Sequence, residues 1–371
     1  MKVKLKTSQL SSAVKVVQKA LTSRAQLPIL SSIKIKTEGD KCSLMATDLF
    51  LGIEVIIPVK DADPGLVIVS GKEFRELVSS ASGDEFELEV KDEKLLVKTG
   101  DFKANFSLFN AQEYPDFPDV SGETITLPLS ELEKIEQEVF FAASTDQTRP
   151  LLTGVLLIKK NGNWEAVVTD GFRLSKTGLS DLDMGKADIE SLLIPVQSLK
   201  EVINIARDQQ IERVKVIISL SNQQLLFRVG DIDIYVRLLE GEYPPYEKII
   251  PTSFDVKVEI DREQLLSHVK RALIFCQNTS NIIKFEIGES LKVSSISSSL
   301  GTYQGELEVD KHKGKQGEIA FNGRYLLDYL TNSDLEKVVF MMTESLRPAV
   351  FSWKDSPDSI YVVMPFRVNK A

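Results

Sequence analysis

The sequence predicts an α+β fold of three similar domains. Each domain is a duplicated unit of one strand, one helix and several further strands, so that two helices pack on antiparallel sheets in every domain. Three observations lead to this prediction: sequence registers recur at a period of about 125 residues, each register holds an amphipathic helical pattern, and short β-type runs follow every helix. The expected domains are residues 1–123, 124–252 and 253–371.

The helices are predicted from the spacing of apolar residues. In the first helix, residues 10, 13, 14 and 17 are apolar and fall at the i, i+3, i+4 and i+7 positions of one face. The equivalent helices of the other two copies open at Leu132 and Leu265. A second helix of each copy contains, at matching positions, Phe74, Leu199 and Leu326. The sequence therefore predicts six helices.

Short β-type runs surround each predicted helix. A strand precedes the first helix of each copy, at residues 3–6, 124–129 and 256–260. The following strands are expected at residues 32–37, 43–46, 52–58, 85–90, 95–98, 103–108, 154–159, 165–168, 174–178, 282–287, 291–295 and 303–309. The last β-type run spans residues 360–368 and contains Pro365. The proline favours an edge strand, with Met364 and Phe366 exposed for a partner. A core strand is the alternative.

Composition and charge are those of an ordinary globular protein, with 43% hydrophobic and 27% charged residues. The net charge of −9 argues against a protein that coats nucleic acid, so contact with a polyanion needs a local face of Lys and Arg. No apolar run approaches the roughly 18–20 residues of a membrane span, and we expect a cytoplasmic protein. Cys42 and Cys276 lack a CxxC pattern and are expected to be two small buried residues.

The stretch of residues 169–174 predicts a turn that presents side chains to a partner. It follows a β-type run and places Gly171 between Asp170 and the pair Phe172 and Arg173. Bulky and cationic groups at a turn are suited to contacts outside the fold. Asp170 is expected to cap backbone amides, because a Thr-Asp turn also occurs at Thr47 in the first copy.

No catalytic, cofactor or metal pattern accompanies this turn. Gly65 and Gly71 are separated by five residues, and Glu73 follows Lys72, so this segment does not fit a phosphate-binding loop. No GxGxxG or GxSxG motif occurs, and the two histidines are far apart. The sequence favours a non-catalytic protein without cofactor or metal. The alternative is an enzyme on a repeated α+β scaffold that uses Asp170 and Arg173.

Basic and amide side chains occur on all six predicted helices. They are Lys15, Lys19, Arg24, Lys72, Arg75, Lys134, Gln197, Lys200, Arg207, Lys270, Arg271, Asn322 and Arg324. Taken singly, such residues usually form a solvated helix face. If related helices present them toward one side, they form a positive lining that contacts phosphates without reading bases.

Seven motifs in order resemble the bacterial DNA polymerase III beta subunit family of sliding clamps over the full chain. They are residues 24–30, 47–49, 106–108, 114–117, 169–174, 321–328 and 361–367. The resemblance implies a ring-shaped homodimer of six domains around double-stranded DNA. Such a processivity factor slides freely and tethers the DNA polymerase III alpha subunit, the clamp loader and other replication and repair proteins. A specialised clamp paralogue, for example in drug resistance, is the alternative.

The resemblance also implies three groups of site residues. A partner-peptide pocket, which takes a glutamine and apolar anchors, would use Leu152, Thr169, Gly171, Phe172, Arg173, Leu174, Pro244, Lys248, Ile249, Leu346, Pro348, Val362, Met364, Pro365 and Phe366. DNA contacts would use Arg24, Lys72, Arg149, Gln197, Asn322 and Tyr325. The dimer interface would pair Phe106 and Leu108 with Ile274 and Phe275. Phe172, Lys248, Phe366, Leu151 and Gln197 differ from the best-known members, which have His, Arg, Met, Tyr and Lys there.

Overall fold

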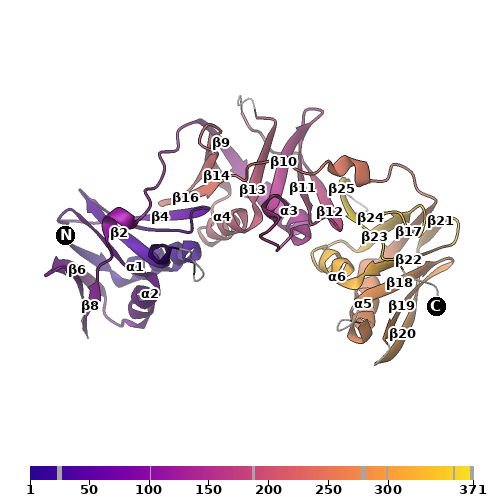
Figure 1. Cartoon of the computed structure of the whole chain (residues 1–371), viewed down its shortest axis with the longest axis horizontal. Coiled ribbons are helices and arrows are strands. Elements are labelled where there is room, and N and C mark those ends of the chain that lie inside the picture. The colour runs from indigo at the N-terminus through magenta and orange to yellow at the C-terminus, as the bar shows by residue number, and fades with distance from the viewer. Residues whose placement is uncertain are drawn as a thin grey trace. The chain divides into compact units, whose positions relative to one another are not determined.

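The computed structural model describes residues 1–22, 27–100, 102–185, 189–276, 281–297, 300–353 and 356–367 (Figure 1). These residues contain six α-helices, as predicted. Their bounds are α1 Thr7–Val17, α2 Gly71–Ser80, α3 Leu129–Val139, α4 Val196–Asp208, α5 Arg262–Cys276 and α6 Gly323–Thr331. The predicted face of α1 is confirmed, because Leu10, Ala13, Val14 and Val17 are its buried residues.

The chain folds into two compact units. The N-terminal unit comprises Met1–Leu129, Asp183–Asp188 and Gln197–Leu238, and the C-terminal unit comprises Ser130–Leu182, Ile189–Val196 and Leu239–Ala371. The boundary between the two units divides the second expected domain, residues 124–252. This happens because the large sheet of each unit joins strands of two neighbouring copies. The division into three domains of residues 1–123, 124–252 and 253–371 remains a prediction.

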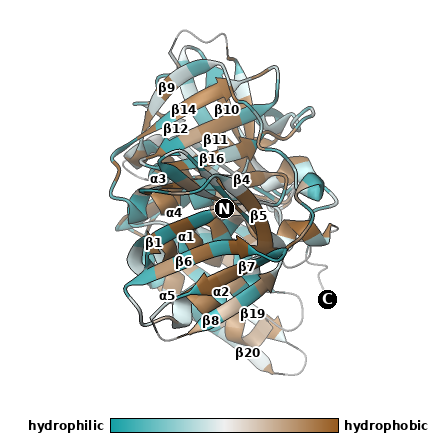
Figure 2. Cartoon of the chain, turned by 90° about the vertical axis from the view of Figure 1, so that its left-hand side faces the viewer, coloured by the Kyte–Doolittle hydropathy of each residue, from teal (hydrophilic) through white to brown (hydrophobic). Residues whose placement is uncertain are grey.

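The N-terminal unit contains an eight-stranded and a four-stranded sheet. The first has the order β5-β2-β3-β4-β16-β15-β14-β9, and its strands are β5 Gly65–Ser70, β2 Ser32–Glu38, β3 Lys41–Thr47, β4 Leu51–Pro58, β16 Ile232–Arg237, β15 Gln224–Val229, β14 Arg213–Ser219 and β9 Glu123–Pro128. The second has the order β1-β6-β7-β8, with β1 Lys2–Lys6, β6 Glu85–Lys91, β7 Lys94–Lys98 and β8 Lys103–Ser107. Strand β5 is hydrophobic over most of its length (Figure 2).

The C-terminal unit contains a nine-stranded and a four-stranded sheet. The first has the order β13-β10-β11-β12-β25-β24-β23-β17-β21, with β13 Ser191–Pro195, β10 Gly154–Lys160, β11 Asn163–Thr169, β12 Arg173–Leu179, β25 Ser356–Val363, β24 Ala349–Trp353, β23 Lys337–Met342, β17 Val256–Asp261 and β21 Lys311–Gly314. The second has the order β20-β19-β18-β22, with β20 Gly301–Glu308, β19 Ser290–Ser297, β18 Ile282–Ile287 and β22 Gly317–Asn322.

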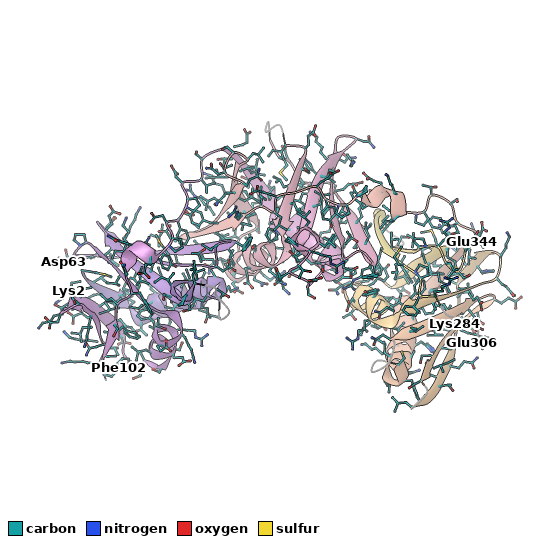
Figure 3. The ribbon with its side chains drawn as sticks, viewed as in Figure 1. Lys2, Asp63, Phe102, Lys284, Glu306 and Glu344 are labelled. Carbon is teal, nitrogen blue, oxygen red and sulfur yellow. The ribbon has the colours of Figure 1, made fainter. Side chains whose placement is uncertain are left out.

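In both four-stranded sheets, buried and charged residues alternate along the strands, so that each sheet has one buried face and one charged face. In β1, Val3 and Leu5 are buried, while Lys2 Nζ lies 2.9 Å from a carboxylate oxygen of Glu87 (Figure 3). In β18, Lys284 Nζ pairs at 2.9 Å with Glu318. Because one face carries charge, each sheet buries only its other face.

The final strand ends earlier than predicted, and its pairing decides between the two alternatives for its position. β25 ends at Val363, so the predicted strand of residues 360–368 does not continue through Pro365. It is an interior strand, since it pairs with β24 on one side and β12 on the other, so the core-strand alternative is confirmed and the edge strand is wrong. The proline follows the strand instead of lying at a sheet edge within it. The predicted exposure beyond the strand is confirmed, since Met364 is 38% and Phe366 48% exposed.

Candidate functional site

The turn between β11 and β12 is held by its own side chains. Gly171 has a φ of +92°, a backbone conformation that favours glycine. Thr169 Oγ1 accepts a hydrogen bond from the Gly171 amide at 3.1 Å. Asp170 Oδ1 accepts from the amides of Phe172 at 2.8 Å and Arg173 at 3.0 Å. The capping role predicted for Asp170 is therefore confirmed.

This turn exposes one residue and buries the next two. Phe172 is 56% exposed, whereas Arg173 is 9% and Leu174 0% exposed. The Thr169 amide donates to the Tyr243 hydroxyl at 3.0 Å. Burial raises the pKa of the Tyr243 phenol, so this group remains a neutral acceptor at physiological pH. The result is a rigid turn that presents an aromatic ring.

Arg173 is a buried cation with several partners. Its Nε donates to Asp170 Oδ2 at 3.0 Å, and its Nη1 donates to Asp328 Oδ2 at 2.6 Å. Its guanidinium carbon lies 4.6 Å from the centre of the Tyr325 ring. A buried guanidinium is stable only when its donors are paired in this way. Arg173 thus fixes the turn to α6 and does not present a reactive cation.

The end of the last strand lies beside the turn. In the register of β12 with β25, Arg173 is opposite Val363 and Leu174 opposite Val362. The ladder continues beyond the strand, because the Met364 amide donates to the Phe172 carbonyl at 2.9 Å. The exposed side chains of Met364 and Phe172 therefore belong to adjacent backbones.

An apolar cluster underlies this surface. Its buried members are Leu156, Val167, Leu174, Leu193, Tyr246, Val350 and Val362. Partly buried residues packed against it include Leu151, Tyr243 and Ile249. The structure thus brings seven of the predicted pocket residues together, namely Thr169, Gly171, Phe172, Arg173, Leu174, Val362 and Met364, with Ile249 at the cluster edge. We refer to the surface formed by the turn and Met364 as the peptide groove, after the partner-peptide pocket that the family resemblance implies there, and peptide binding at this surface remains a prediction.

The other predicted pocket residues lie in the same unit, but their described contacts do not link them to the turn. Leu152 is buried, Leu346 is 57% exposed, and Lys248 lies within the short helix Tyr246–Ile249. Pro244, Pro348, Pro365 and Phe366 complete this set, and their role in the groove remains a prediction. The amide of Phe366 donates to the Ala320 carbonyl at 2.7 Å, which holds the end of the segment in place.

The predicted DNA-contact residues are distributed over both units. Lys72 and Gln197 are exposed and occupy matching positions in the first turns of α2 and α4. Asn322 is the N-cap of α6 and accepts from the Arg324 amide at 3.0 Å. Arg24 lies outside the described residues. These side chains remain predicted contacts.

Arg149 and Tyr325 are adjacent to the peptide groove. Arg149 Nε pairs with Asp146 Oδ2 at 3.1 Å, and its Nη1 donates to the Asp170 carbonyl at 3.3 Å. The Tyr325 ring packs against the buried guanidinium of Arg173. A DNA-facing role for Arg149 would therefore lie beside the turn that presents Phe172.

Several basic residues of the helices are already engaged within their own unit. Lys19 Nζ lies 3.2 Å from a carboxylate oxygen of Glu201. Lys134 Nζ donates to the Gly178 carbonyl at 2.8 Å, and Arg75 Nη1 donates to Gln18 Oε1 at 3.3 Å. These bonds compete with phosphate contacts, so fewer helix-borne basic side chains are available for the positive lining inferred from the sequence.

One predicted interface residue lies on the edge strand β8 and another stacks on the edge strand β20. Phe106 is on β8 and packs edge-on against Phe74, with ring centres 5.7 Å apart. Ile274 of α5 is 61% exposed, and Phe275 stacks on Tyr303 of β20 at 6.2 Å. Within the described sheets, β8 and β20 each have a hydrogen-bonded neighbour on one side only. Sequence reasoning did not name Tyr303 among the interface candidates, although this residue begins the predicted strand 303–309 and stacks on Phe275.

Sequence reasoning also missed Asp328 as a site residue. It lies in one of the motifs quoted for the family resemblance, four residues after Arg324 on α6. Only the folded chain shows that its carboxylate reaches Arg173. Among the described residues, no group of three or more His, Cys, Asp or Glu side chains could hold a metal ion. No helix in the described ranges is long and apolar enough to span a membrane.

Family profiles match three successive parts of the chain. The DNA polymerase III beta subunit N-terminal domain matches residues 1–118, its central domain residues 126–245, and its C-terminal domain residues 247–367. A relative from Staphylococcus epidermidis named beta sliding clamp is 29% identical over 361 residues, which cover 94% of each chain. A Staphylococcus aureus protein of the same name is 28% identical over 363 residues, again covering 94% of each chain.

Solved structures show the same architecture. The DNA polymerase sliding clamp from Bacillus subtilis matches with a TM-score of 0.90 and 27% identity, covering 100% of both chains. The beta subunit from DNA polymerase of Streptococcus pyogenes matches with a TM-score of 0.91 and 28% identity, covering 99% of this chain and 100% of the other.

Proposed function

Because this chain belongs to the DNA polymerase III beta subunit family, we infer that it is a sliding clamp of DNA replication, a processivity factor without catalytic activity of its own. The observation that carries this conclusion is the match of all three beta-subunit domains, in order, along one chain. The fold of repeated helices on antiparallel sheets supports it. The site of action would be the cytoplasm.

The active form would be a homodimer closed into a ring around double-stranded DNA. Strands β8 and β20 each offer one unpaired edge within the described sheets, and such edges are templates for pairing with another chain. Phe106 and Leu108 of one protomer would meet Ile274 and Phe275 of its partner. The contact joins different surfaces, so it is heterologous and closes after two subunits.

DNA binding by such a ring would be weak and independent of sequence. Topology keeps a closed ring on DNA, so each phosphate contact needs to contribute little. The side chains proposed for these contacts are Arg24, Lys72, Arg149, Gln197, Asn322 and Tyr325. A net charge of −9 is compatible with this role, because it limits tight association with the polyanion.

The peptide groove would tether the partners. The DNA polymerase III alpha subunit, the clamp loader and other proteins would each insert a short peptide with a glutamine and apolar anchors. Phe172 and Met364 are exposed on adjacent backbones and would contact these anchors. A groove with a few fixed polar groups suits this mode of recognition.

A retention assay tests the ring. The protein is loaded by a clamp loader onto nicked circular DNA and, in parallel, onto the same DNA after linearisation. A ring stays on the circle and slides off the free ends of the linear molecule. The two samples are compared by gel filtration after a fixed interval. Equal retention on both DNAs would contradict the proposal.

A further inference from the structure

Two carboxylates face each other where the first and second copies of the repeat join in the N-terminal unit. Strand β4 belongs to the first copy and β16 to the second, and their antiparallel register places Glu54 directly opposite Asp233. Side chains in such a pair have Cβ atoms about 5 Å apart, so the two carboxyl groups can reach one another. Like charges in this arrangement destabilise a sheet. We refer to Glu54 and Asp233 as the acid pair.

The adjacent strands supply one cation for the two acids. Arg228 of β15 lies opposite Asp233, and its Nε is 3.3 Å from Asp233 Oδ1. On the other side of the acid pair, Met45 of β3 lies opposite Glu54. The immediate neighbour of Glu54 on that side is therefore apolar, and its charge is not offset from an adjacent strand.

The next cations on the Glu54 side have carboxylate partners of their own. Lys34 and Lys36 lie on β2, two strands from Glu54 and therefore about 10 Å away. Lys34 Nζ lies 3.6 Å from a carboxylate oxygen of Asp116, and Lys36 Nζ lies 2.5 Å from a carboxylate oxygen of Glu38. Neither lysine therefore takes the place of an adjacent cation for Glu54.

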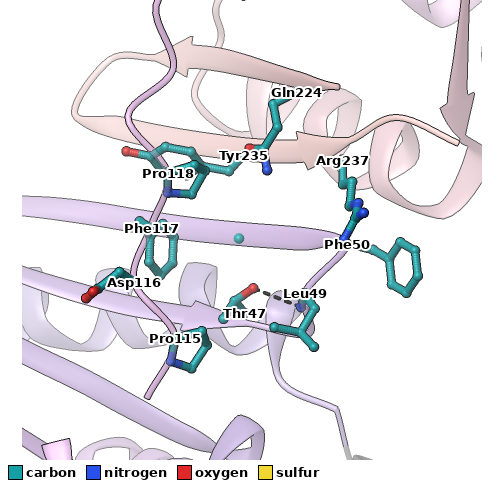
Figure 4. A pocket seen from close by; sticks show the side chains of 11 residues that line it. Thr47, Leu49, Phe50, Pro115, Asp116, Phe117, Pro118, Gln224, Tyr235 and Arg237 are labelled. Carbon is teal, nitrogen blue, oxygen red and sulfur yellow. Dashed lines mark hydrogen bonds between the residues drawn. The ribbon is translucent and has the colours of Figure 1, made fainter. Parts of the chain in front are cut away.

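The face that carries the acid pair is partly covered. Tyr235 follows Asp233 by two residues on β16 and therefore projects from the same face. Segment 115–118 crosses this face, and Phe117 meets Tyr235 edge-on beside the pocket that both residues line, with ring centres 4.9 Å apart (Figure 4). The Asp233 side chain is 18% exposed. A carboxylate that loses part of its hydration in this way favours its neutral form.

Burial dominates the electrostatics of Glu54. It raises the pKa of the Glu54 carboxyl group, hydrogen bonding by Ser43 opposes this shift, and the negative charge of Asp233 adds to it. Hydrogen bonding by Tyr235 and the charge of Lys36 are smaller opposing effects. Glu54 therefore holds a proton more tightly in the folded chain than an exposed glutamate does.

The other member of the pair is the better acceptor. Burial raises the pKa of Asp233 as well, but the charge of Arg228 and its hydrogen bond oppose that shift. Arg228 thus favours the ionised form of Asp233, and the proton belongs on Glu54. Because Arg228 occupies Asp233 Oδ1, the second carboxylate oxygen of Asp233 is the one left for Glu54.

We propose that the acid pair is a proton-dependent lock between the first and second copies, in which Glu54 binds one proton from solvent and donates it in a hydrogen bond to Asp233 Oδ2. Proton binding removes one negative charge from the pair, and no covalent bond other than the new O–H bond of Glu54 is formed or broken. The pairing of β4 with β16 would tighten as the pH falls and loosen as it rises. This inference does not depend on the proposed function.

The lock stabilises the folded chain in mild acid. Because the folded chain has the higher pKa at Glu54, it retains the proton at pH values where the unfolded chain has released it. The contribution is fully present below the unfolded pKa of about 4.3 and is lost as the pH rises through the folded pKa. His268 of the C-terminal unit has a lowered pKa and acts in the opposite direction, so the test needs a local measurement at β4 and β16.

Hydrogen exchange of the full-length chain, followed by mass spectrometry, provides that local measurement. In Glu54→Gln, an amide that donates a hydrogen bond at every pH replaces the carboxyl group. Exchange of the β16 segment should then be about threefold slower than in the parent at pH 8, where the parent has released its proton. This ratio should fall toward one at pH 5, where the parent carries the proton.

Glu38→Gln is the matched control, because it removes a carboxylate of the same sheet whose partner is Lys36. It should not slow exchange of β16 at either pH. The proposal is overturned if Glu54→Gln does not slow β16 exchange at pH 8, or if the ratio is the same at both pH values.

The parent chain gives a second measurement that decides the question if Glu54→Gln does not fold. Strand β14 belongs to the same sheet and contains no carboxylate, so it serves as the internal reference. After correction for intrinsic exchange rates, the protection of β16 should rise relative to that of β14 between pH 8 and pH 5. Relative protection that stays constant or falls would overturn the proposal.

Discussion

Arg173 and Asp328 form an ion pair of 2.6 Å between β12 and α6, although 155 residues separate them in the sequence. The arginine is 9% exposed and the aspartate side chain 42% exposed. The pair joins the second copy of the repeat to the third, at the base of the peptide groove. It therefore determines whether the turn that carries Phe172 keeps its place beside the last strand.

Asp328→Asn should destabilise the C-terminal unit by about 1 kcal/mol, because it removes the charge but keeps an acceptor, and solvent already screens the exposed carboxylate. Arg173→Ala should cost more, about 3 kcal/mol, because it leaves both Asp328 and the Oδ2 atom of Asp170 without the guanidinium that pairs with them. Urea unfolding followed by the fluorescence of the buried Trp164 measures both effects. If the double variant showed simple additivity of the two losses, the pair would not be coupled.

Met364→Ala should weaken binding of a glutamine-containing partner peptide by about 2 kcal/mol, or roughly 30-fold, since it removes an apolar anchor beside Phe172. Calorimetric titration measures the affinity, and retention on circular DNA should be largely unchanged. Leu220→Ala is the matched control, because it shortens an apolar side chain of similar exposure, 42% against 38%, in the N-terminal unit. Unchanged affinity in Met364→Ala would place the peptide elsewhere.

Ile274→Asp should convert the dimer to monomers. The side chain is 61% exposed, so a carboxylate there is tolerated in the free chain but would be buried unpaired in the interface. Light scattering after gel filtration gives the mass. Leu220→Asp, at a residue 42% exposed, is the control and should leave the mass unchanged. A dimer that survives Ile274→Asp would contradict the proposed interface.

The combined replacement Phe106→Ala and Leu108→Ala should also open the dimer. Because Phe106 packs on Phe74, this variant also loses contacts within its own unit. Its thermal unfolding must therefore be compared with that of the parent. A folded variant with half the parent mass supports the interface, whereas a folded variant of unchanged mass does not.

Stability should fall as the pH drops from about 7 to 5, in part through His268. Burial, and then the charge of Arg271, lower the pKa of this imidazole, whose Nδ1 lies 2.8 Å from the Tyr303 hydroxyl. Below the unfolded pKa of about 6.5 the unfolded chain takes up a proton that the native histidine does not, which favours unfolding. His268→Gln should reduce this pH dependence in urea titrations. His312→Gln, at the other histidine, is the control, and an equal reduction there would refute the assignment.

Both thiols should be inert in the folded chain. Burial raises the pKa of Cys42 to about 12 and also raises that of Cys276, so neither forms much thiolate at pH 8. A chromogenic disulfide reagent should label neither residue rapidly, and both in denaturant. Fast labelling of the native protein would show that one site opens.

The sequence allowed the local structure to be predicted because each local element has its own chemical pattern. Apolar spacing predicted α1 with its buried face, and the Thr-Asp-Gly order predicted the capped turn at Asp170. The isolated cysteines were expected to be buried, and they are. The spacing of the helix face and the capping of the turn depend on residues within one or two turns of chain, so local physics decides these two features.

The sequence left the position of the last strand open between a sheet edge and the core. Pro365 indicated an edge, but it lies beyond β25, whose two neighbours come from different copies. Which strands become neighbours depends on backbone hydrogen bonds, and every strand offers the same donors and acceptors. The side-chain pattern of residues 360–363 therefore could not distinguish an interior strand from an edge strand.

By itself, the sequence determined a threefold repeat, six helices with apolar faces, and a Thr-Asp turn in two copies. Only the tertiary structure decided that β25 lies against β12 and β16 against β4, so that each turn meets the end of a strand from the next copy. The physical reason is range: helix faces and caps follow from neighbouring residues, whereas the pairing of distant strands and the Arg173–Asp328 contact exist only once the whole chain has packed.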